Sequence, residues 1–290
     1  MDHRVMDEDR RDGAQSIERT LKLMQLVGRA GPEGTRLADL VAHSSLPKPT
    51  VRRLLLALMR GGMVEQDSVS RRYFIGPEAY VLGIAASARF GIHALSLAGL
   101  SRLAIASEDS AFVSVRRDSF SVCLHCEEGA FPIRTQVLKA GDRHPLGVGG
   151  GSLAILAALS DEGVTQVLEQ NAKLLRDEYP TYSPELLWRC VEETRKNGYA
   201  FNPGILMPGS WAIGIAVRDA QGQPIGALSI AAIESRLQEE RRIELAPILR
   251  KEALMLEAAL QQPSTHSGEQ QAHLRRAQLA ALTHNRKTSK

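Results

Sequence analysis

The segment between Thr35 and Gly76 constrains the fold most, because its apolar and turn residues predict four short elements in a definite order. A short amphipathic helix is broken by the tetrapeptide Ser-Ser-Leu-Pro, and a second helix is expected over Lys48 to Arg60. Two short strands joined by a polar turn follow, with arginines near the turn. Apolar residues of the second helix recur every three or four positions and share one face: Val51, Leu54, Leu55 and Leu58. This order of helix, turn, helix and hairpin is typical of a winged helix-turn-helix.

The second of these helices carries positive charge on the surface that its apolar face leaves exposed. No acidic residue occurs between Asp39 and Glu65, whereas acids and bases are mixed along the rest of the chain. A helix that is packed on one side and cationic on the other suits the major groove of DNA. A basic face that is merely solvated is the alternative interpretation, but the order of the elements favours DNA binding.

The candidate DNA-binding residues are Lys48, Pro49, Thr50, Arg52 and Arg53 in the helix, and Arg71 and Arg72 in the wing. We expect Thr50 and Arg52 to face base edges or nearby phosphates, and the other cations to contact phosphates. The net charge of the chain is only +3, so its basicity is local and favours a specific contact with double-stranded operator DNA.

Length and composition bound the class of protein. A chain of 290 residues has room for two domains, and the second is large enough to bury a core. The N-terminal stretch lacks the apolar core of a signal peptide, and no apolar run reaches membrane-spanning length. Three cysteines without a secretory segment fit a reducing compartment. We therefore expect a cytoplasmic protein that does not bind a membrane.

Changes in composition divide the chain into five segments. A disordered N-terminal tail is expected over residues 1–15, a winged helix-turn-helix domain over 16–77 and a linker helix over 78–94. A second domain is expected over 95–262, followed by a disordered basic tail over 263–290. The linker helix has an apolar stripe with few charges, which either pairs with a second copy of the chain or packs on its own domain.

The second domain mixes helices and strands without regular alternation, which predicts an α+β fold with an antiparallel sheet. Strands are expected over residues 111–116, 121–125, 131–139, 211–218 and 224–233. Helices are expected over residues 95–106, 153–159, 161–175, 184–197 and 239–260. Signatures of nucleophilic or metal-dependent catalysis are missing from the sequence, so we expect no catalytic residue and no cofactor.

The sequence Cys123-Leu124-His125-Cys126 has the residue types of a metal-binding knuckle. A zinc site would require a second ligand pair, and none follows at a suitable distance. The flanking pattern indicates a strand, in which side chains three positions apart point to opposite faces, so no metal site is expected. Two alternatives stay open: a metal- or redox-sensing regulator that uses Cys123 and Cys126, and an enzyme whose winged helix binds other proteins.

Polar residues and glycines of the second domain cluster in two places that point to a ligand pocket, Gly147 to Ser152 and Asn202 to Trp211. The run Gly149-Gly150-Gly151-Ser152 precedes a predicted helix, so its N–H groups can hold a carboxylate, unless the glycines only let the helix approach the sheet. Trp211 either forms an aromatic wall of the pocket or belongs to the core.

Particular residues in both domains carry a resemblance to a known family. They are the run Leu46 to Leu55, the segment Tyr73 to Pro77, the tetrapeptide Asn197 to Ala200 and the run Gly214 to Ile230. In their order and spacing the chain resembles the IclR-type bacterial transcriptional regulators. The resemblance implies a winged helix-turn-helix followed by an effector domain with a GAF-like or PAS-like sheet. It also implies homodimers, or dimers of dimers, that bind palindromic operators and respond to small organic effectors, often carboxylates or aromatic acids.

The resemblance further implies where the effector binds. Family contacts come from the Gly-rich turn, the loop before the late hairpin and the inner strands of that hairpin. With Trp211 added as an aromatic wall, the effector-binding residues are Gly150, Gly151, Asn202, Ser210, Trp211, Ala212, Ser229 and Ala231.

The chain departs from the commoner family pattern in this region. Many members have an acidic stretch where residues 202–209 of this chain contain no acid, and Ala231 stands where a second serine is frequent. Loss of the carboxylates lowers charge repulsion against an anionic ligand and makes the pocket more apolar. We therefore expect an aromatic or acyl carboxylate as effector rather than a two- or three-carbon acid.

Overall fold

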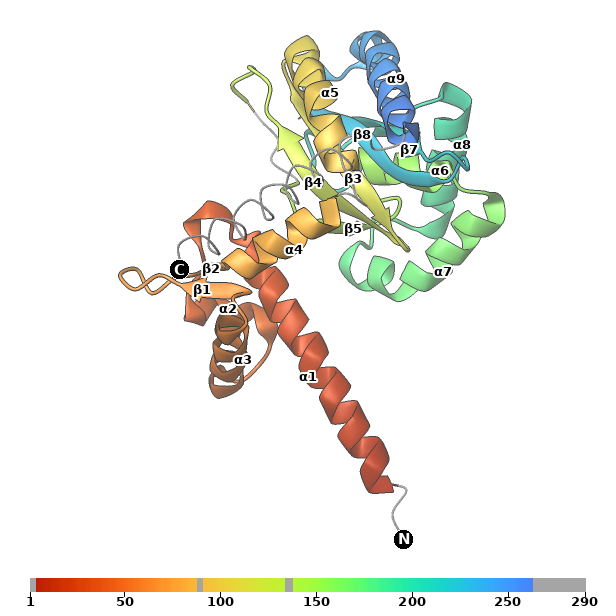
Figure 1. Ribbon diagram of the computed structural model, residues 1–290. Helices are drawn as coiled ribbons and strands as arrows, with labels where there is room; N and C mark the ends of the chain where they lie inside the picture. The colour runs from red at the N-terminus through yellow and green to blue at the C-terminus, as the bar shows by residue number, and fades with distance from the viewer. Residues whose placement is uncertain (1–3, 88–90, 134–137, 263–290) are drawn as a thin grey trace, which may run out of the picture.

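The N-terminal part of the protein is a winged helix-turn-helix. The computed structural model describes residues 4–87, 91–133 and 138–262. Three helices pack around a small core: α1 (Arg4–Arg29), α2 (Leu37–Ser44) and α3 (Lys48–Arg60). A 3₁₀ turn, η1 (Gly31–Glu33), joins the first two helices, and the wing is the antiparallel pair β1 (Val64–Gln66) and β2 (Tyr73–Ile75). Figure 1 shows the wing projecting beside α3. The predicted order of elements is confirmed.

Helix α1 begins earlier than the sequence analysis predicts. Residues 4–15 belong to this helix, whereas a disordered tail was expected over 1–15; residues 1–3 lie outside the described part. The expectation rested on the high charge of the segment. That segment nevertheless contains several good helix formers, arginine, methionine, glutamate, alanine and glutamine, and it contains no proline.

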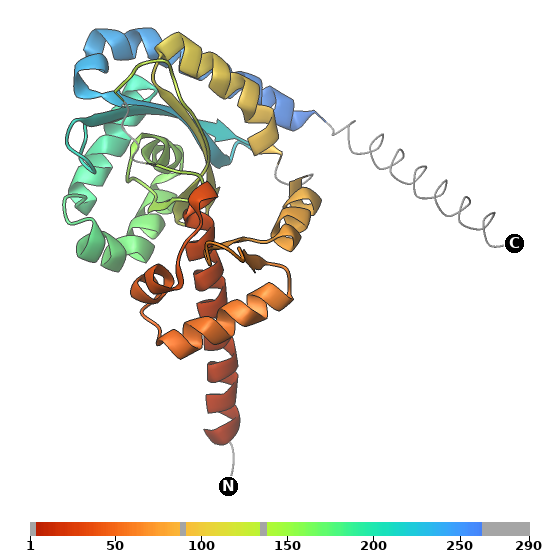
Figure 2. The ribbon, with the colours of Figure 1, turned by 90° about the vertical axis from the view of Figure 1, so that its left-hand side faces the viewer.

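The linker expected over 78–94 is divided between two helices. Helix α4 (Pro77–Ser87) leaves the wing, and helix α5 (Ile92–Ser107) opens the second domain. Residues 88–90 lie outside the described part. Figures 1 and 2 both show α4 lying between the winged domain and the second domain.

The second domain is built on one six-stranded antiparallel sheet with the order β5-β4-β3-β8-β7-β6. Its strands are β3 (Ser110–Arg117), β4 (Phe120–Glu127), β5 (Arg143–Pro145), β6 (Ala200–Asn202), β7 (Ser210–Arg218) and β8 (Pro224–Ile233). The third strand was expected over 131–139 and instead lies at β5. Residues 131–133 and 138–139 are not strands, and 134–137 lie outside the described residues.

Helices cover both faces of the sheet. Helix α5 and helix α9 (Glu239–Gln261) pack on one face, with the short η2 (Glu234–Arg236) preceding α9. The other face is covered by α6 (Gly150–Ala157), α7 (Asp161–Glu178) and α8 (Pro184–Asn197). The side-chain hydroxyls of Ser160 and Ser183 cap α7 and α8. The predicted α+β architecture is thus confirmed.

Helix α6 approaches the sheet more closely than a side chain would permit. A Cβ atom added at Gly214 in β7 would lie 2.5 Å from the carbonyl oxygen of Gly150. Glycine at this position lets the first turn of the helix rest directly on the strand. The beginning of α6 is therefore held at a definite place over the middle of the sheet.

Candidate DNA-binding surface and ligand pocket

Helix α3 separates its apolar and cationic faces as the sequence predicts. Its four periodic apolar residues are buried in the core of the winged domain. The side chains of Lys48, Pro49, Arg52 and Arg53 are exposed, and Thr50 is partly buried. No acidic residue lies in the first turn of the helix. Helix α3 therefore offers solvent a cationic face of the kind that enters a DNA groove.

The wing and two helices form a shallow groove that brings several of these cations together. Lys48 and Arg52 of α3 share this groove with Arg71 of the wing and with Arg36 at the start of α2. Sequence reasoning missed Arg36, whose main-chain N–H donates a hydrogen bond to the Asp39 carboxylate at 3.3 Å. In the sequence, Arg36 is marked only by its position immediately before a predicted helix.

Arg72 has a different environment from its neighbour. Its Nη1 donates hydrogen bonds to the carbonyl oxygens of Glu33 at 3.1 Å and Gly34 at 3.0 Å. These bonds fasten the wing to the loop between α1 and α2. Arg71, by contrast, is exposed near the end of the wing. The phosphate contacts expected for both residues stay predictions, but the two arginines are not equivalent.

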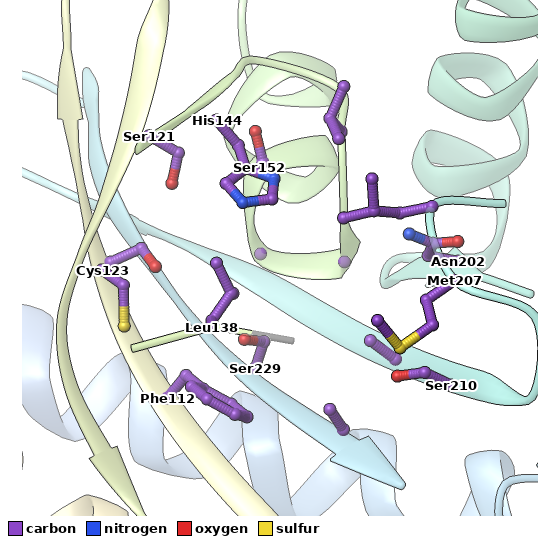
Figure 3. A pocket seen from close by; sticks show the side chains of 18 residues that line it. Phe112, Ser121, Cys123, Leu138, His144, Ser152, Asn202, Met207, Ser210 and Ser229 are labelled. Carbon is purple, nitrogen blue, oxygen red and sulfur yellow. The ribbon is translucent and has the colours of Figure 1, made fainter. Parts of the chain in front are cut away.

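The second domain contains a pocket between the sheet and the beginning of α6 (Figure 3). Every strand of the sheet contributes at least one residue to its wall. The polar residues of the lining are Ser114, Ser121, Cys123, His144, Ser152, Asn202, Ser210 and Ser229. The apolar side chains are Phe112, Leu138, Val148, Leu206, Met207, Ala212 and Ala231. Within this lining no residue is an acid, a lysine or an arginine.

Seven of the eight residues expected to bind an effector line this pocket: Gly150, Gly151, Asn202, Ser210, Ala212, Ser229 and Ala231. Trp211 does not, and its assignment as an aromatic wall is corrected. Side chains alternate along β7, so Trp211 points to the opposite face of the sheet from its two neighbours. There its ring packs edge-on against Phe201, 5.2 Å between centroids, with Arg242 nearby.

Four serine residues of the lining are buried, but their hydroxyls open into the cavity and have no hydrogen bond to any residue in the described part of the chain: Ser114, Ser121, Ser210 and Ser229. Ser152 differs, since its hydroxyl donates to the carbonyl of Pro145 at 3.0 Å. A hydroxyl that loses water without gaining another partner costs free energy, so a molecule that fills the cavity must pair with these hydroxyls. The lining is therefore suited to a ligand with polar groups.

The first turn of α6 adds backbone donors to the same cavity. Within the described residues, the N–H groups of Gly150, Gly151 and Ser152 donate to no acceptor. A Cβ added at Gly151 would lie 3.1 Å from the Ser229 hydroxyl oxygen, so these donors and that hydroxyl are adjacent. The N-terminus of a helix attracts negative charge, and here buried donors of two kinds meet.

Asn202 lines the pocket but is already engaged by the protein. Its Oδ1 accepts a hydrogen bond from the Ile205 N–H at 3.0 Å, and its Nδ2 donates to the Tyr182 hydroxyl at 3.3 Å. These bonds shape the loop that carries Leu206 and Met207. Asn202 therefore organises this wall of the pocket as well as facing it.

His144 and Cys123 are pocket residues that sequence reasoning missed. Both come from strands whose pairing brings distant segments together, and β5 was not predicted at its true position. Burial lowers the pKa of the His144 ring, so the neutral form is favoured near pH 7; the Asp142 carboxylate acts in the opposite direction. Burial also raises the pKa of the Cys123 thiol to about 12, which keeps it protonated and unreactive.

A β-bulge corrects the expected geometry of the cysteine segment. The register of β4 against β3 shifts between Val113 and Ser114, so Cys123 pairs with Ser114 and Cys126 pairs with Phe112. Both cysteines consequently face the pocket side, although side chains three positions apart were expected to point to opposite faces. His125 pairs with Val113 and faces α5, where its ring lies 5.5 Å from His93.

The bulge therefore separates the histidine from the two cysteines. Among the described residues no three histidine, cysteine or acidic side chains are grouped as metal ligands. In the same residues no helix is long and apolar enough to cross a bilayer.

A cationic winged helix-turn-helix joined to a sheet domain with a pocket of hydroxyls and apolar side chains defines a ligand-responsive DNA-binding regulator. Comparison with known families agrees with this class. Residues 16–68 match the IclR helix-turn-helix domain, and residues 85–258 match the bacterial transcriptional regulator IclR C-terminal domain. The chain belongs to the IclR family, so it is a DNA-binding transcriptional regulator with a C-terminal effector-binding domain and not an enzyme.

Several relatives match along most of the chain. The transcriptional repressor AllR of Salmonella typhimurium is 29% identical over 252 residues, covering 86% of this chain and 90% of the relative. AllR of Escherichia coli K12 is 28% identical, covering 86% and 91%.

Solved structures share the fold. An IclR-type regulator from Alicyclobacillus acidocaldarius is 25% identical with a TM-score of 0.68, covering 84% of this chain and 98% of its own. An IclR homologue from Microbacterium hydrocarbonoxydans, complexed with 4-hydroxybenzoate, is 18% identical with a TM-score of 0.68 and the same coverage.

Proposed function

We propose that the protein is a sequence-specific regulator whose affinity for operator DNA changes when an organic acid occupies the pocket. The observation that carries the proposal is that serine hydroxyls and free N–H groups of the first turn of α6 open into the same pocket. These groups hold a carboxylate by hydrogen bonds and by the field of the helix N-terminus. Because lysine, arginine and acidic side chains are absent from the lining, the site favours a single negative charge on a largely apolar molecule.

The apolar wall determines the size and shape of the acid. Phe112, Leu138 and Met207 offer contact surface that a two-carbon acid cannot cover. An aromatic or acyl carboxylate buries this surface and gains free energy in proportion to the apolar area removed from water. The relative solved with 4-hydroxybenzoate supports an aromatic acid as the first class to test.

DNA recognition is assigned to the groove beside α3. Arg52 reads base edges, with Thr50 beside it, while Lys48, Arg53 and Arg71 neutralise phosphates. Arg72 supports the wing through its two carbonyl bonds and adds positive charge near the backbone. In a dimer, two such surfaces bind half-sites about one turn of DNA apart.

Helix α4 supplies the proposed contact between two copies of the chain. Tyr80 is 72% exposed, and Val81, Leu82 and Ile84 are each more than half exposed. An apolar surface of this kind on one short helix favours self-association over contact with water. Because α4 lies between the two domains, a pocket ligand that moves it changes the spacing of the two α3 helices.

The test is selection of genomic DNA fragments by the purified full-length protein at physiological salt, with and without a set of aromatic and acyl acids. A few enriched palindromic sites, released or tightened by one acid, are the expected result. Diffuse enrichment that no acid alters would contradict the proposal. A reporter gene downstream of a selected site then distinguishes repression, the mode of the AllR relatives, from activation.

The dimer contact has its own test. Val81→Glu is expected to shift the protein from dimer to monomer in sedimentation velocity and to weaken operator binding. Ile105→Glu is the matched control, because this residue of α5 is also exposed but lies in the second domain. Equal behaviour of both variants would contradict the assignment to α4.

A further inference from the structure

The groove between α2, α3 and the wing gathers four cationic side chains that have no acidic partner. Lys48 and Arg52 come from α3, Arg71 comes from the wing, and Arg36 comes from the residue before α2. None of the described residues that line the groove is acidic, and none of the four cations forms an ion pair within the described part of the chain. Like charges gathered in one groove repel each other, so an anion that enters it is favoured.

The main chain beside Arg36 is fastened to the wing. The Thr35 N–H donates to the Tyr73 carbonyl oxygen at 3.0 Å, and the Tyr73 N–H donates to the Thr35 carbonyl oxygen at 2.7 Å. Tyr73 begins strand β2, and Arg71 lies two residues before it. The segment that carries Arg36 is therefore held against the wing, on the side of the groove opposite α3.

Arg36 occupies the N-cap position of α2, where its side chain does not help the helix. Serine, threonine, aspartate and asparagine are favoured at an N-cap because a side-chain oxygen accepts a hydrogen bond from the first turn. A guanidinium group has donors only, so it cannot do this. The cap is formed instead by Asp39, whose carboxylate accepts a hydrogen bond from the Arg36 main-chain N–H at 3.3 Å. The side chain of Arg36 is left exposed, with its charge at the groove.

Resting on the proposed DNA-binding role of this groove, we propose that Arg36 binds a DNA phosphate beside the wing, and that it does so at the expense of the stability of α2. The N-terminus of α2 carries partial positive charge, which favours the same phosphate. Phosphate contacts carry no sequence information, so Arg36 strengthens binding to operator and to unrelated DNA alike. It adds one contact per protomer to those assigned to Lys48, Arg53 and Arg71.

The experiment is Arg36→Ser in the full-length protein, because serine removes the charge and supplies a capping oxygen. Fluorescence anisotropy at several salt concentrations measures binding to a duplex obtained by genomic selection and to a random duplex of the same length. We expect the slope of log affinity against log salt to fall by about one per protomer, and both duplexes to be weakened by the same factor. The melting temperature of the winged domain should rise, because α2 gains a cap.

Two control variants separate charge at this position from charge elsewhere. Arg36→Lys keeps the charge and should retain the wild-type slope. Arg176→Ser removes an arginine of α7 that is 74% exposed in the second domain, and it should leave the slope unchanged.

Three results would overturn the assignment of Arg36. They are a wild-type slope in Arg36→Ser, a loss of affinity confined to the selected duplex, and a lower melting temperature that accompanies weaker binding. The second result would indicate that Arg36 contacts bases, and the third that it supports the fold. Failure of the wild-type protein to bind either duplex would overturn the DNA-binding role of the groove together with this inference.

Discussion

The α3–wing surface and the ligand pocket recognise their partners with opposite kinds of side chain. The first is an exposed groove of lysine and arginine side chains with no acid in the first turn of α3. The second is an enclosed space lined by hydroxyls and apolar groups, without a lysine or arginine. Exposed charges act at a distance and through released counterions, whereas buried hydroxyls act only on contact and only if each is paired. The same chain thus separates long-range attraction from short-range selection.

Salt provides the largest expected difference between the two regions. If Lys48, Arg53 and Arg71 each neutralise one phosphate, as proposed, a dimer makes six such contacts. Raising salt from about 50 to about 200 mM should then lower operator affinity by roughly a thousandfold. Over the same range of salt, the affinity of the pocket for an organic acid should change only a few-fold. Parallel fluorescence titrations with DNA and with the acid measure how each affinity depends on salt. A similar salt dependence for both ligands would contradict this difference between the two regions.

Arg52→Ala is expected to give the next largest effect. If Arg52 reads base edges, its loss should cost about 1–3 kcal/mol at the preferred operator and less on unrelated DNA. Competition binding with operator and random duplexes measures the ratio, and acid affinity serves as the internal control. An unchanged order of preferred operators in repeated selection would contradict this role.

The two wing arginines sharpen the comparison further. Arg71→Ala should lower the slope of log affinity against log salt by about one per protomer and leave the melting temperature unchanged. Arg72→Ala should also lower the melting temperature, because it removes the bonds to Glu33 and Gly34. Differential scanning fluorimetry together with salt titrations separates the two. Identical thermal behaviour of the two variants would argue against a supporting role for Arg72.

The smallest expected effect concerns pH and the stability of the effector domain. Burial lowers the pKa of His144 and of His93, with His125 adding to the effect on His93. Below the ordinary histidine pKa of about 6.5, the unfolded chain binds protons that the buried rings of the folded protein do not. The free energy of unfolding therefore decreases as the pH is lowered. Above that value this contribution to stability is fully present. Urea unfolding at pH 7.5, 6.5 and 5.5 should show a shallower decline for His144→Gln than for the wild type, and equal declines would contradict it.

Local patterns were sufficient to predict the exposed cationic face of α3. The apolar period of α3 and the break at Pro47 lie within a few residues of the cations that they position, so no distant contact was needed. Arg36 was missed because its proximity to Arg52 depends on how α2 crosses α3.

The pocket was predicted less completely, because its wall is assembled across six strands. Seven residues were located by resemblance to a family, whereas Trp211 was misplaced although alternation along β7 separates it from Ser210 and Ala212. His144 and Ser121 meet only through the pairing of β4 with β5, a contact between segments that sequence spacing does not indicate. The bulge in β4 likewise reversed the side on which Cys126 lies.

The contact between Gly214 and Gly150 has a consequence for how new specificities arise in such a sensor. It holds the first turn of α6, where the proposed function places the effector carboxylate, at a constant position, since any side chain at 214 would collide with the helix backbone. The edge strand β5, by contrast, is only three residues long, pairs with β4 alone and contributes His144 to the lining. If the proposed function holds, substitutions in β5 change which acid fits while the helix turn stays in place, so we expect a biosensor based on this protein to be retuned by changes in β5.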